Sequence, residues 1–275
     1  MEPHPKDQTG PVKTVHLPDL PGVDVPGAGV TFHWHPPERP GPRARHGIVV
    51  PPILAGDYEV STLFASSFAS RGYSCLRFER RVEWLDAERE PEVLGPLVAQ
   101  YVEDIRRGIA WWSEAGDLSA PLGLFGVSMG AIIGTVLAAR EPSLGPAVLC
   151  MGGGPLAEVL TTAREEMFDD FRSDLTKRLG GWESALMPRF VRSMKGHDPI
   201  EMAPLLDPSR VLFVGTIFDR VIHPTHQNRL WEALGRPRRI RLPCGHYSAA
   251  LFVPLIRYLA GRWFDQHFEL SPQAD

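Results

Sequence analysis

One stretch of the chain, residues 118–139, carries no Asp, Glu, Lys or Arg over 22 consecutive positions. An uncharged stretch of that length lies either across a bilayer or in a protein interior. Pro121 and glycines at positions 123, 126, 130 and 134 interrupt it, and its middle has the composition of a turn. A buried strand that passes directly into a buried helix has the same length and explains the glycines. We therefore expect a sheet that is buried on both faces, and no membrane span.

The chain alternates between two kinds of segment from residue 46 onward. Short apolar runs predict strands at 46–52, 74–80, 121–128, 146–154, 210–219 and 238–243. Apolar positions at helical spacing predict helices at 59–71, 96–115, 129–141, 225–234 and 251–268. Two further short strands are expected at 13–17 and 30–34. Strands separated by helices of this length favour an α/β fold with a mostly parallel sheet.

The 275 residues are expected to form a single domain, 1–275, with two segments outside this alternation. Residues 1–45 hold ten of the 27 prolines and predict an extended N-terminal segment that contains the first strands. This segment either wraps around the core or mediates the formation of a homodimer, and both roles stay open. Residues 155–206 predict helices without a strand, and so a small cap inserted between two core strands. We interpret the aromatic and methionine residues of the cap as packing residues.

Charge and cysteine usage exclude several classes of partner. The net charge is −4, with acidic and basic residues interspersed, which argues against a nucleic acid or an anionic membrane as partner. The three cysteines lie far apart and form no C-x-x-C pair, so we expect free buried thiols, with no metal and no cofactor. The N-terminus shows no apolar signal segment, and a cytoplasmic location is expected.

Residues 126–130 read Gly-Val-Ser-Met-Gly, which fits the pattern G-x-S-x-G. The pattern alone is weak, but here an apolar strand enters it and an apolar helix leaves it, which is the setting of a nucleophile elbow. Such a turn holds the serine in a strained conformation with its hydroxyl pointing outward. Glycines flank it because larger side chains would clash with the neighbouring strand and helix. Ser128 is therefore predicted to be a nucleophile, and the alternative is a small residue at a tight turn.

A serine hydroxyl needs a base to take its proton, and the base needs an acid to orient it. His246 follows the last predicted strand, and Asp219 ends the strand before it. The carboxyl ends of parallel strands meet at one edge of a sheet, so both residues are expected beside Ser128. His223 and His226 compete with His246 for the role of the base, and Asp219 has the alternative role of a turn residue.

Two backbone N–H groups are expected to stabilise the oxyanion of the tetrahedral intermediate. One belongs to Met129, directly after the nucleophile, and the other to the loop that follows strand 46–52. Pro51 and Pro52 have no N–H, so the second donor is expected at Leu54, with Ile53 as the alternative.

Over residues 46–268 the chain resembles the α/β-hydrolase superfamily. The likeness rests on "GVSMG", "VLFVGTIFD" and "CGHYS", in the order of that family. The segment "DPSRVLFVGTIFDRVIHP" is similar to the acid-bearing strand of dienelactone-hydrolase-like and esterase-like members. The resemblance implies an α/β-hydrolase fold with an eight-stranded sheet, a Ser-Asp-His triad and water as the usual acceptor. One departure is the pair Pro52-Ile53, which replaces the common His-Gly before the oxyanion donor.

The sequence thus predicts a serine hydrolase that cleaves an ester or related acyl bond of a small molecule through an acyl-enzyme. The same triad also serves thioester, amide or peptide and carbon–carbon hydrolysis, or acyl transfer, and these stay open. A catalytically inactive binding protein with this fold is the third hypothesis. The cap of about fifty residues suits small or medium acyl substrates.

Overall fold

The computed structural model describes residues 11–21, 29–54, 59–115 and 118–270. These residues form one eight-stranded sheet in the order β1-β2-β4-β3-β5-β6-β7-β8. The strands from β3 to β8 are mutually parallel, and β2 pairs antiparallel with β1 and β4. This confirms the predicted mostly parallel sheet. The strand bounds are β1 (Lys13–Leu17), β2 (Val30–His35), β3 (His46–Val50), β4 (Ser74–Phe78), β5 (Ser119–Val127), β6 (Leu144–Cys150), β7 (Val211–Thr216) and β8 (Arg238–Leu242).

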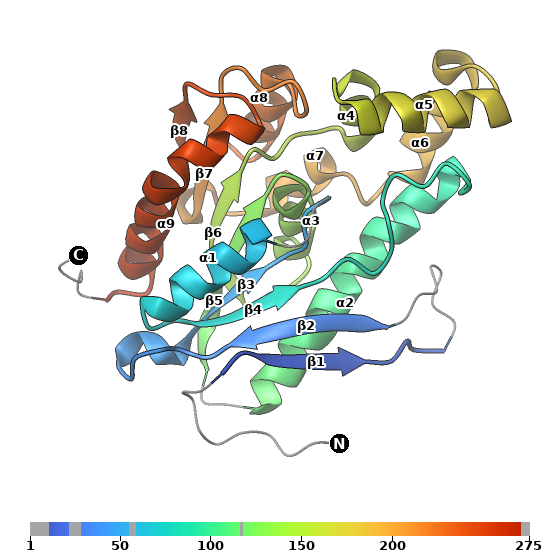
Figure 1. Cartoon of the computed structure of the whole chain (residues 1–275). Coiled ribbons are helices and arrows are strands. Elements are labelled where there is room, and N and C mark those ends of the chain that lie inside the picture. Colours follow the sequence, from blue (N-terminus) through green and yellow to red (C-terminus); the bar gives the residue numbers. More distant parts are fainter. Residues whose placement is uncertain (1–10, 22–28, 55–58, 116–117, 271–275) are drawn as a thin grey trace.

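Helices pack on both faces of the sheet (Figure 1). One face packs against α1 (Glu59–Ser70) and α9 (Val253–His267), the other against α2 (Leu94–Ala115), α3 (Met129–Ala138) and α8 (Pro224–Ala233). The core is divided accordingly, because neighbouring residues of a strand point to opposite faces. In β5, Leu124 belongs to the cluster under α2 and α3, and Phe125 to the cluster under α1 and α9. The uncharged stretch is thus explained by burial on both faces. Among the described residues, no helix is long and apolar enough to cross a membrane.

A block of short helices lies between β6 and β7 in the sequence, within residues 155–206. It consists of α4 (Leu156–Thr162), α5 (Glu166–Leu179), α6 (Met187–Ser193) and α7 (Pro199–Met202), with a π-helical turn at Trp182–Leu186 and a 3-10 turn at Ala203–Leu205. In Figure 1, α4, α5 and α6 extend beyond the tip of β6. Further 3-10 turns occur at Pro42–Arg45, Pro91–Val93, Pro208–Arg210 and Tyr247–Phe252.

The first part of the chain contributes β1 and β2 to the antiparallel end of the sheet. Residues 1–10 and 22–28 of the expected N-terminal segment lie outside the described residues. All three cysteines are free and buried, as expected.

A buried ionic cluster ties the amino ends of the central strands to α9. Asp265 on α9 accepts hydrogen bonds from Arg43 Nε at 2.8 Å and from the Tyr73 hydroxyl at 2.5 Å, and Arg71 lies 3.9 Å away. Arg43 shortly precedes β3 and Tyr73 directly precedes β4. The cluster therefore lies at the opposite end of the sheet from the edge where the parallel strands finish.

Candidate active site

Ser128 lies between the end of β5 and the first residue of α3. Its backbone has φ 55° and ψ −120°, a conformation that few residues other than glycine adopt and that costs about 1–3 kcal/mol. The backbone N–H of Ser128 donates to the carbonyl of Cys150 at 2.8 Å, which fixes the turn against β6. This strained strand-to-helix turn is the geometry expected of a nucleophile elbow.

The two flanking glycines are needed because backbone approaches both of them closely. A Cβ atom on Gly126 would lie 2.4 Å from the carbonyl oxygen of Gly130. A Cβ atom on Gly130 would lie 3.1 Å from the carbonyl oxygen of Pro52. The second distance also places the loop after β3 directly against the turn that holds Ser128.

Asp219 and His246 form a hydrogen-bonded pair beyond the carboxyl ends of β7 and β8. His246 Nδ1 and Asp219 Oδ2 are 2.9 Å apart, and the Asp219 side chain is fully buried. Because the carboxylate is an acceptor, this bond assigns the proton to Nδ1 and leaves Nε2 with a free lone pair. The Asp219 carboxylate therefore fixes the ring of His246 through Nδ1.

Neutral donors hold the Asp219 carboxylate in place. Oδ1 accepts from the backbone N–H groups of Val221 and Ile222, both at 2.9 Å. Oδ2 accepts from the Thr216 hydroxyl at 2.8 Å and from the Gln227 amide at 3.2 Å. These bonds compensate for the burial of the carboxylate and fix its orientation toward the histidine.

Ser128 and His246 line one cavity of about 290 Å³. Cys150 also lies in its wall, and burial raises the pKa of its thiol, so this cysteine stays protonated and acts as an apolar wall residue. Among the described residues, no group of three His, Cys, Asp or Glu side chains is placed to hold a metal ion.

The two competing histidines are placed elsewhere. His223 precedes α8 and accepts from the backbone N–H of Thr225. His226 is buried, and its Nε2 lies 2.8 Å from the Thr162 hydroxyl on α4. Burial lowers the pKa of His226. Among these three histidines of the described residues, His246 is the one that is hydrogen-bonded to Asp219.

No protein-family model matches the chain. Two curated relatives, the uncharacterized proteins Rv2627c and MT2702 of Mycobacterium tuberculosis, are 31% identical over 163 residues. That match covers 58% of this chain and only 36% of each relative, so the chain spans little more than a third of their length.

Several solved structures share the architecture. The alpha/beta hydrolase GrgF from a Penicillium species matches with a TM-score of 0.65 at 15% identity, over 94% of this chain and 100% of that chain. The esterase Pf2001 of Pyrococcus furiosus matches with a TM-score of 0.63 at 12% identity, over 95% of both chains. A puromycin-hydrolyzing peptidase of M. tuberculosis matches with a TM-score of 0.67 at 18% identity, over 96% of this chain and 40% of that chain.

The chain has the α/β-hydrolase fold. At these identities the likeness concerns the fold alone, and the structures that share it include both esterases and a peptidase.

In the α/β-hydrolase fold, oxyanion donors come from the residue after the nucleophile and from the loop after β3. Met129 is the first residue of α3, and the first N–H groups of a helix have no acceptor within the helix. Ile53 and Leu54 both line the cavity that contains Ser128, so the choice between them as second donor stays open.

Two groups of residues at the site were missed by the sequence interpretation. Thr216 and Gln227 hold Asp219, and Met167 and Phe168 of α5 line the cavity although the cap residues were interpreted as packing. Gln227 could have been found from the sequence. It lies one turn before Leu230 on the same face of α8, and a polar residue on a buried helix face indicates a hydrogen-bonding role. Met167 and Phe168 carry none, since helical spacing does not tell a core from a cavity wall.

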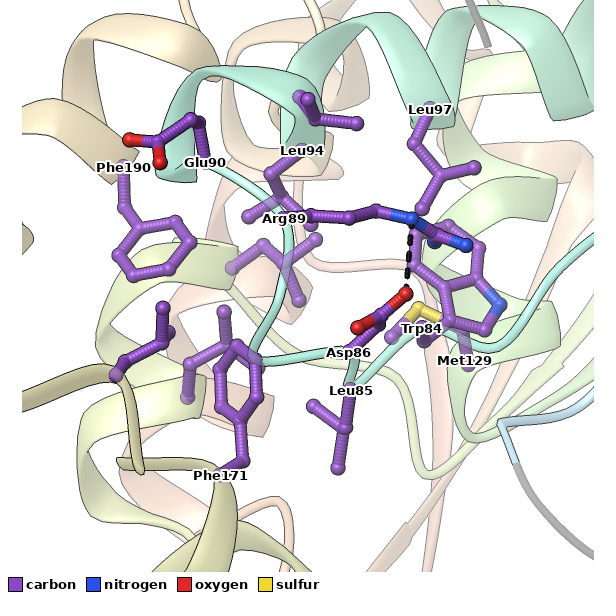
Figure 2. Close-up of a pocket in the computed structure, with 14 residues that line it drawn as sticks. Trp84, Leu85, Asp86, Arg89, Glu90, Leu94, Leu97, Met129, Phe171 and Phe190 are labelled. Atoms are coloured by element: carbon purple, nitrogen blue, oxygen red, sulfur yellow. Dashed lines mark ion pairs between the residues drawn. The ribbon is translucent and has the colours of Figure 1, made fainter. Parts of the chain in front are cut away.

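A second hollow, of about 30 Å³, lies beside Met129, the residue that follows Ser128 (Figure 2). The Met129 side chain forms part of its wall, together with Trp84, Leu97 and the cap residues Phe171 and Phe190. At its rim, Arg89 pairs with Asp86 at 3.2 Å.

The cap is bonded to the connection between β4 and α2 beside this second hollow. Arg178 of α5 donates to Glu90 at 2.8 Å, and Arg189 of α6 donates to Glu92 at 2.7 Å. The chain thus has a roomy cavity beside Ser128 and a nearly filled hollow beside Met129.

Proposed function

We propose that this chain is a serine hydrolase of the carboxylesterase type, which cleaves a carboxylic ester of a small molecule through an acyl-enzyme. The observation that carries the proposal is the joint placement of a strained Ser128 and of a His246 oriented by Asp219 on one cavity. A turn residue has no need of this strain, and a loop histidine has no need of a buried carboxylate with four further donors.

In this reaction, Ser128 Oγ attacks the carbonyl carbon of the ester while its proton passes to His246 Nε2. Asp219 stabilises the resulting imidazolium through Nδ1. The tetrahedral intermediate collapses, the bond from carbon to the alcohol oxygen breaks, and His246 gives its proton to the leaving alcohol. Water then attacks the acyl-enzyme with His246 as base again, which releases the carboxylic acid and restores Ser128.

The negative oxygen of each tetrahedral intermediate accepts hydrogen bonds from the N–H of Met129 and from that of Leu54, with Ile53 as the alternative. Both positions lie at the turn and loop that meet beside Ser128. Asp219 does not touch the substrate and acts by orienting His246.

The test is turnover of p-nitrophenyl butyrate together with labelling by a fluorophosphonate, in wild type and in Ser128→Ala. We expect the variant to lose at least about 10³-fold in kcat and all labelling, because removal of a nucleophile leaves only the residual catalysis of the remaining site. Ser113→Ala, which removes an exposed serine of α2, is the matched control. A folded Ser128→Ala variant with wild-type turnover would exclude the proposal.

A further inference from the structure

The cavity beside Ser128 is lined almost entirely by apolar side chains. Among the described residues, the lining side chains that carry a polar group are those of Ser128, Cys150, His246 and Tyr247. No Asp, Glu, Lys or Arg lines it among the described residues. The remaining lining residues are Ile53, Leu54, Val60, Phe64, Val127, Met151, Met167, Phe168, Val221, Ala249, Ala250, Val253 and Ile256.

The cavity has an exposed mouth and a buried inner end. Tyr247, next to His246, is 63% exposed, and Val60 is 42% exposed. Phe64, Phe168 and Ile256 are at most 3% exposed and come from α1, α5 and α9. Side chains from three separate helices thus contribute to the buried part of the wall, and Tyr247, the chain neighbour of His246, belongs to its exposed part.

The difference between the exposed mouth and the buried inner end indicates where each half of an ester lies. His246 returns a proton to the leaving alcohol, which must reach solvent while the acyl group stays bonded to Ser128. The alcohol therefore lies toward Tyr247, and the acyl group lies toward Phe168 and Ile256.

We propose, on the basis of the proposed function, that the inner end is an acyl pocket for uncharged, apolar acyl chains of medium length, and that Phe168 of the cap sets their length. The cavity of about 290 Å³ also has to hold the reacting carbonyl group and, at its mouth, the alcohol, so its inner end limits the length of the acyl chain. A charged group at the far end of the chain is rejected, because it would be buried without a partner.

Phe171 offers a matched control for Phe168. Both phenylalanines are buried on α5, at 3% and 7% exposure, within one turn of each other. Phe168 lines the cavity of Ser128, whereas Phe171 points into the second hollow (Figure 2). Alanine at either position removes a buried aromatic ring from the same helix, but only Phe168→Ala enlarges the acyl pocket.

The experiment measures kcat/KM for p-nitrophenyl esters with straight acyl chains of increasing length. We expect a rise of about fourfold per methylene group, which corresponds to the burial of one CH₂. The rise should end at the chain length that fills the pocket. Phe168→Ala should move the preferred length upward, and Phe171→Ala should leave it unchanged. A p-nitrophenyl ester whose acyl chain ends in a carboxylate should react at least about 10²-fold more slowly than the uncharged ester of equal length.

Fluorophosphonate labelling that depends on Ser128 separates the two proposals. If the protein is labelled but kcat/KM does not change with the length of the acyl chain, the acyl pocket is excluded. The same holds if charged and uncharged esters react equally. In both cases the proposed hydrolase activity is unaffected. An equal shift in Phe168→Ala and Phe171→Ala would exclude Phe168 as the residue that sets the length. In a second series, with a fixed acetyl group and alcohols of increasing length, kcat/KM should stay constant. If kcat/KM rose in that series alone, the pocket would hold the alcohol instead of the acyl group.

Discussion

Two buried aspartates at opposite ends of the sheet have different partners. Asp219 and Asp265 are 1% and 2% exposed, and each accepts at least two hydrogen bonds. The partners of Asp219 are two backbone N–H groups, a hydroxyl, an amide and a histidine. The partners of Asp265 are the Arg43 guanidinium and the Tyr73 hydroxyl, with a second guanidinium, that of Arg71, at 3.9 Å.

The difference lies in what happens to the negative charge. The hydrogen bond from Arg43 neutralises Asp265, and the same bond raises the pKa of Arg43. Burial, together with the bond to Asp265, raises the pKa of Tyr73, so its hydroxyl remains a donor. Asp265 is therefore a fixed link between α9 and the starts of β3 and β4. Neutral donors orient Asp219 without cancelling its charge, so that charge is available to an imidazolium at His246.

The largest expected effect is that of Asp219→Asn on turnover. The amide keeps the size of the side chain but removes the charge and reverses the preferred tautomer of His246, so kcat should fall by about 10⁴-fold. It should be measured with p-nitrophenyl butyrate, with circular dichroism as a check of folding. Asp207→Asn, on the exposed carboxylate just before β7, is the matched control and should keep wild-type kcat. A fall of less than tenfold in Asp219→Asn would contradict a role for its charge.

Asp265→Asn should lower stability and leave turnover almost unchanged. Removing one partner of a buried ion pair leaves Arg43 without its counter-charge, so the free energy of unfolding should fall by about 3–5 kcal/mol. Urea denaturation measures this loss. The kcat of the folded fraction should stay within a factor of two or so of wild type, since Asp265 does not line the cavity of Ser128. If kcat fell as far as in Asp219→Asn, the two ends of the sheet would be coupled and the comparison would fail.

The two aspartates also differ in how far the sequence could predict them. Asp219 follows an apolar strand in a chain whose Ser, Asp and His residues occur in the order of a known fold, so local pattern and order suffice. Asp265 lies inside a helical pattern, and its partner Arg43 is 222 residues away in a proline-rich segment. Periodicity shows which face of a helix is buried but not what that face contacts, so this ion pair could not be predicted.

The same limit applies to the cap. Its helical content could be predicted from spacing, and the structure shows helices throughout that block. Spacing treats Met167, Phe168 and Phe171 alike as apolar positions. Their division between two hollows depends on how α5 packs against segments that are distant in the sequence. The helices and strands could thus be predicted from the sequence, whereas the cap residues that line the cavity of Ser128 could not.

The smallest expected effects come from removing one neutral donor at each aspartate. Tyr73→Phe deletes the hydroxyl that donates to Asp265, and Thr216→Val deletes the hydroxyl that donates to Asp219. Loss of the bond to Asp265 should cost about 1–2 kcal/mol of unfolding free energy in Tyr73→Phe. The loss should be larger in Thr216→Val, because the Thr216 hydroxyl also accepts a hydrogen bond from the Gln227 amide at 3.0 Å. Only Thr216→Val should also lower kcat, by a few fold, because it loosens the carboxylate that orients His246. Urea titration and steady-state kinetics on both variants measure the two effects. A change of kcat in Thr216→Val alone would show that the orientation of Asp219 matters for turnover and that of Asp265 does not. An equal change of kcat in both variants would contradict this difference between the two carboxylates.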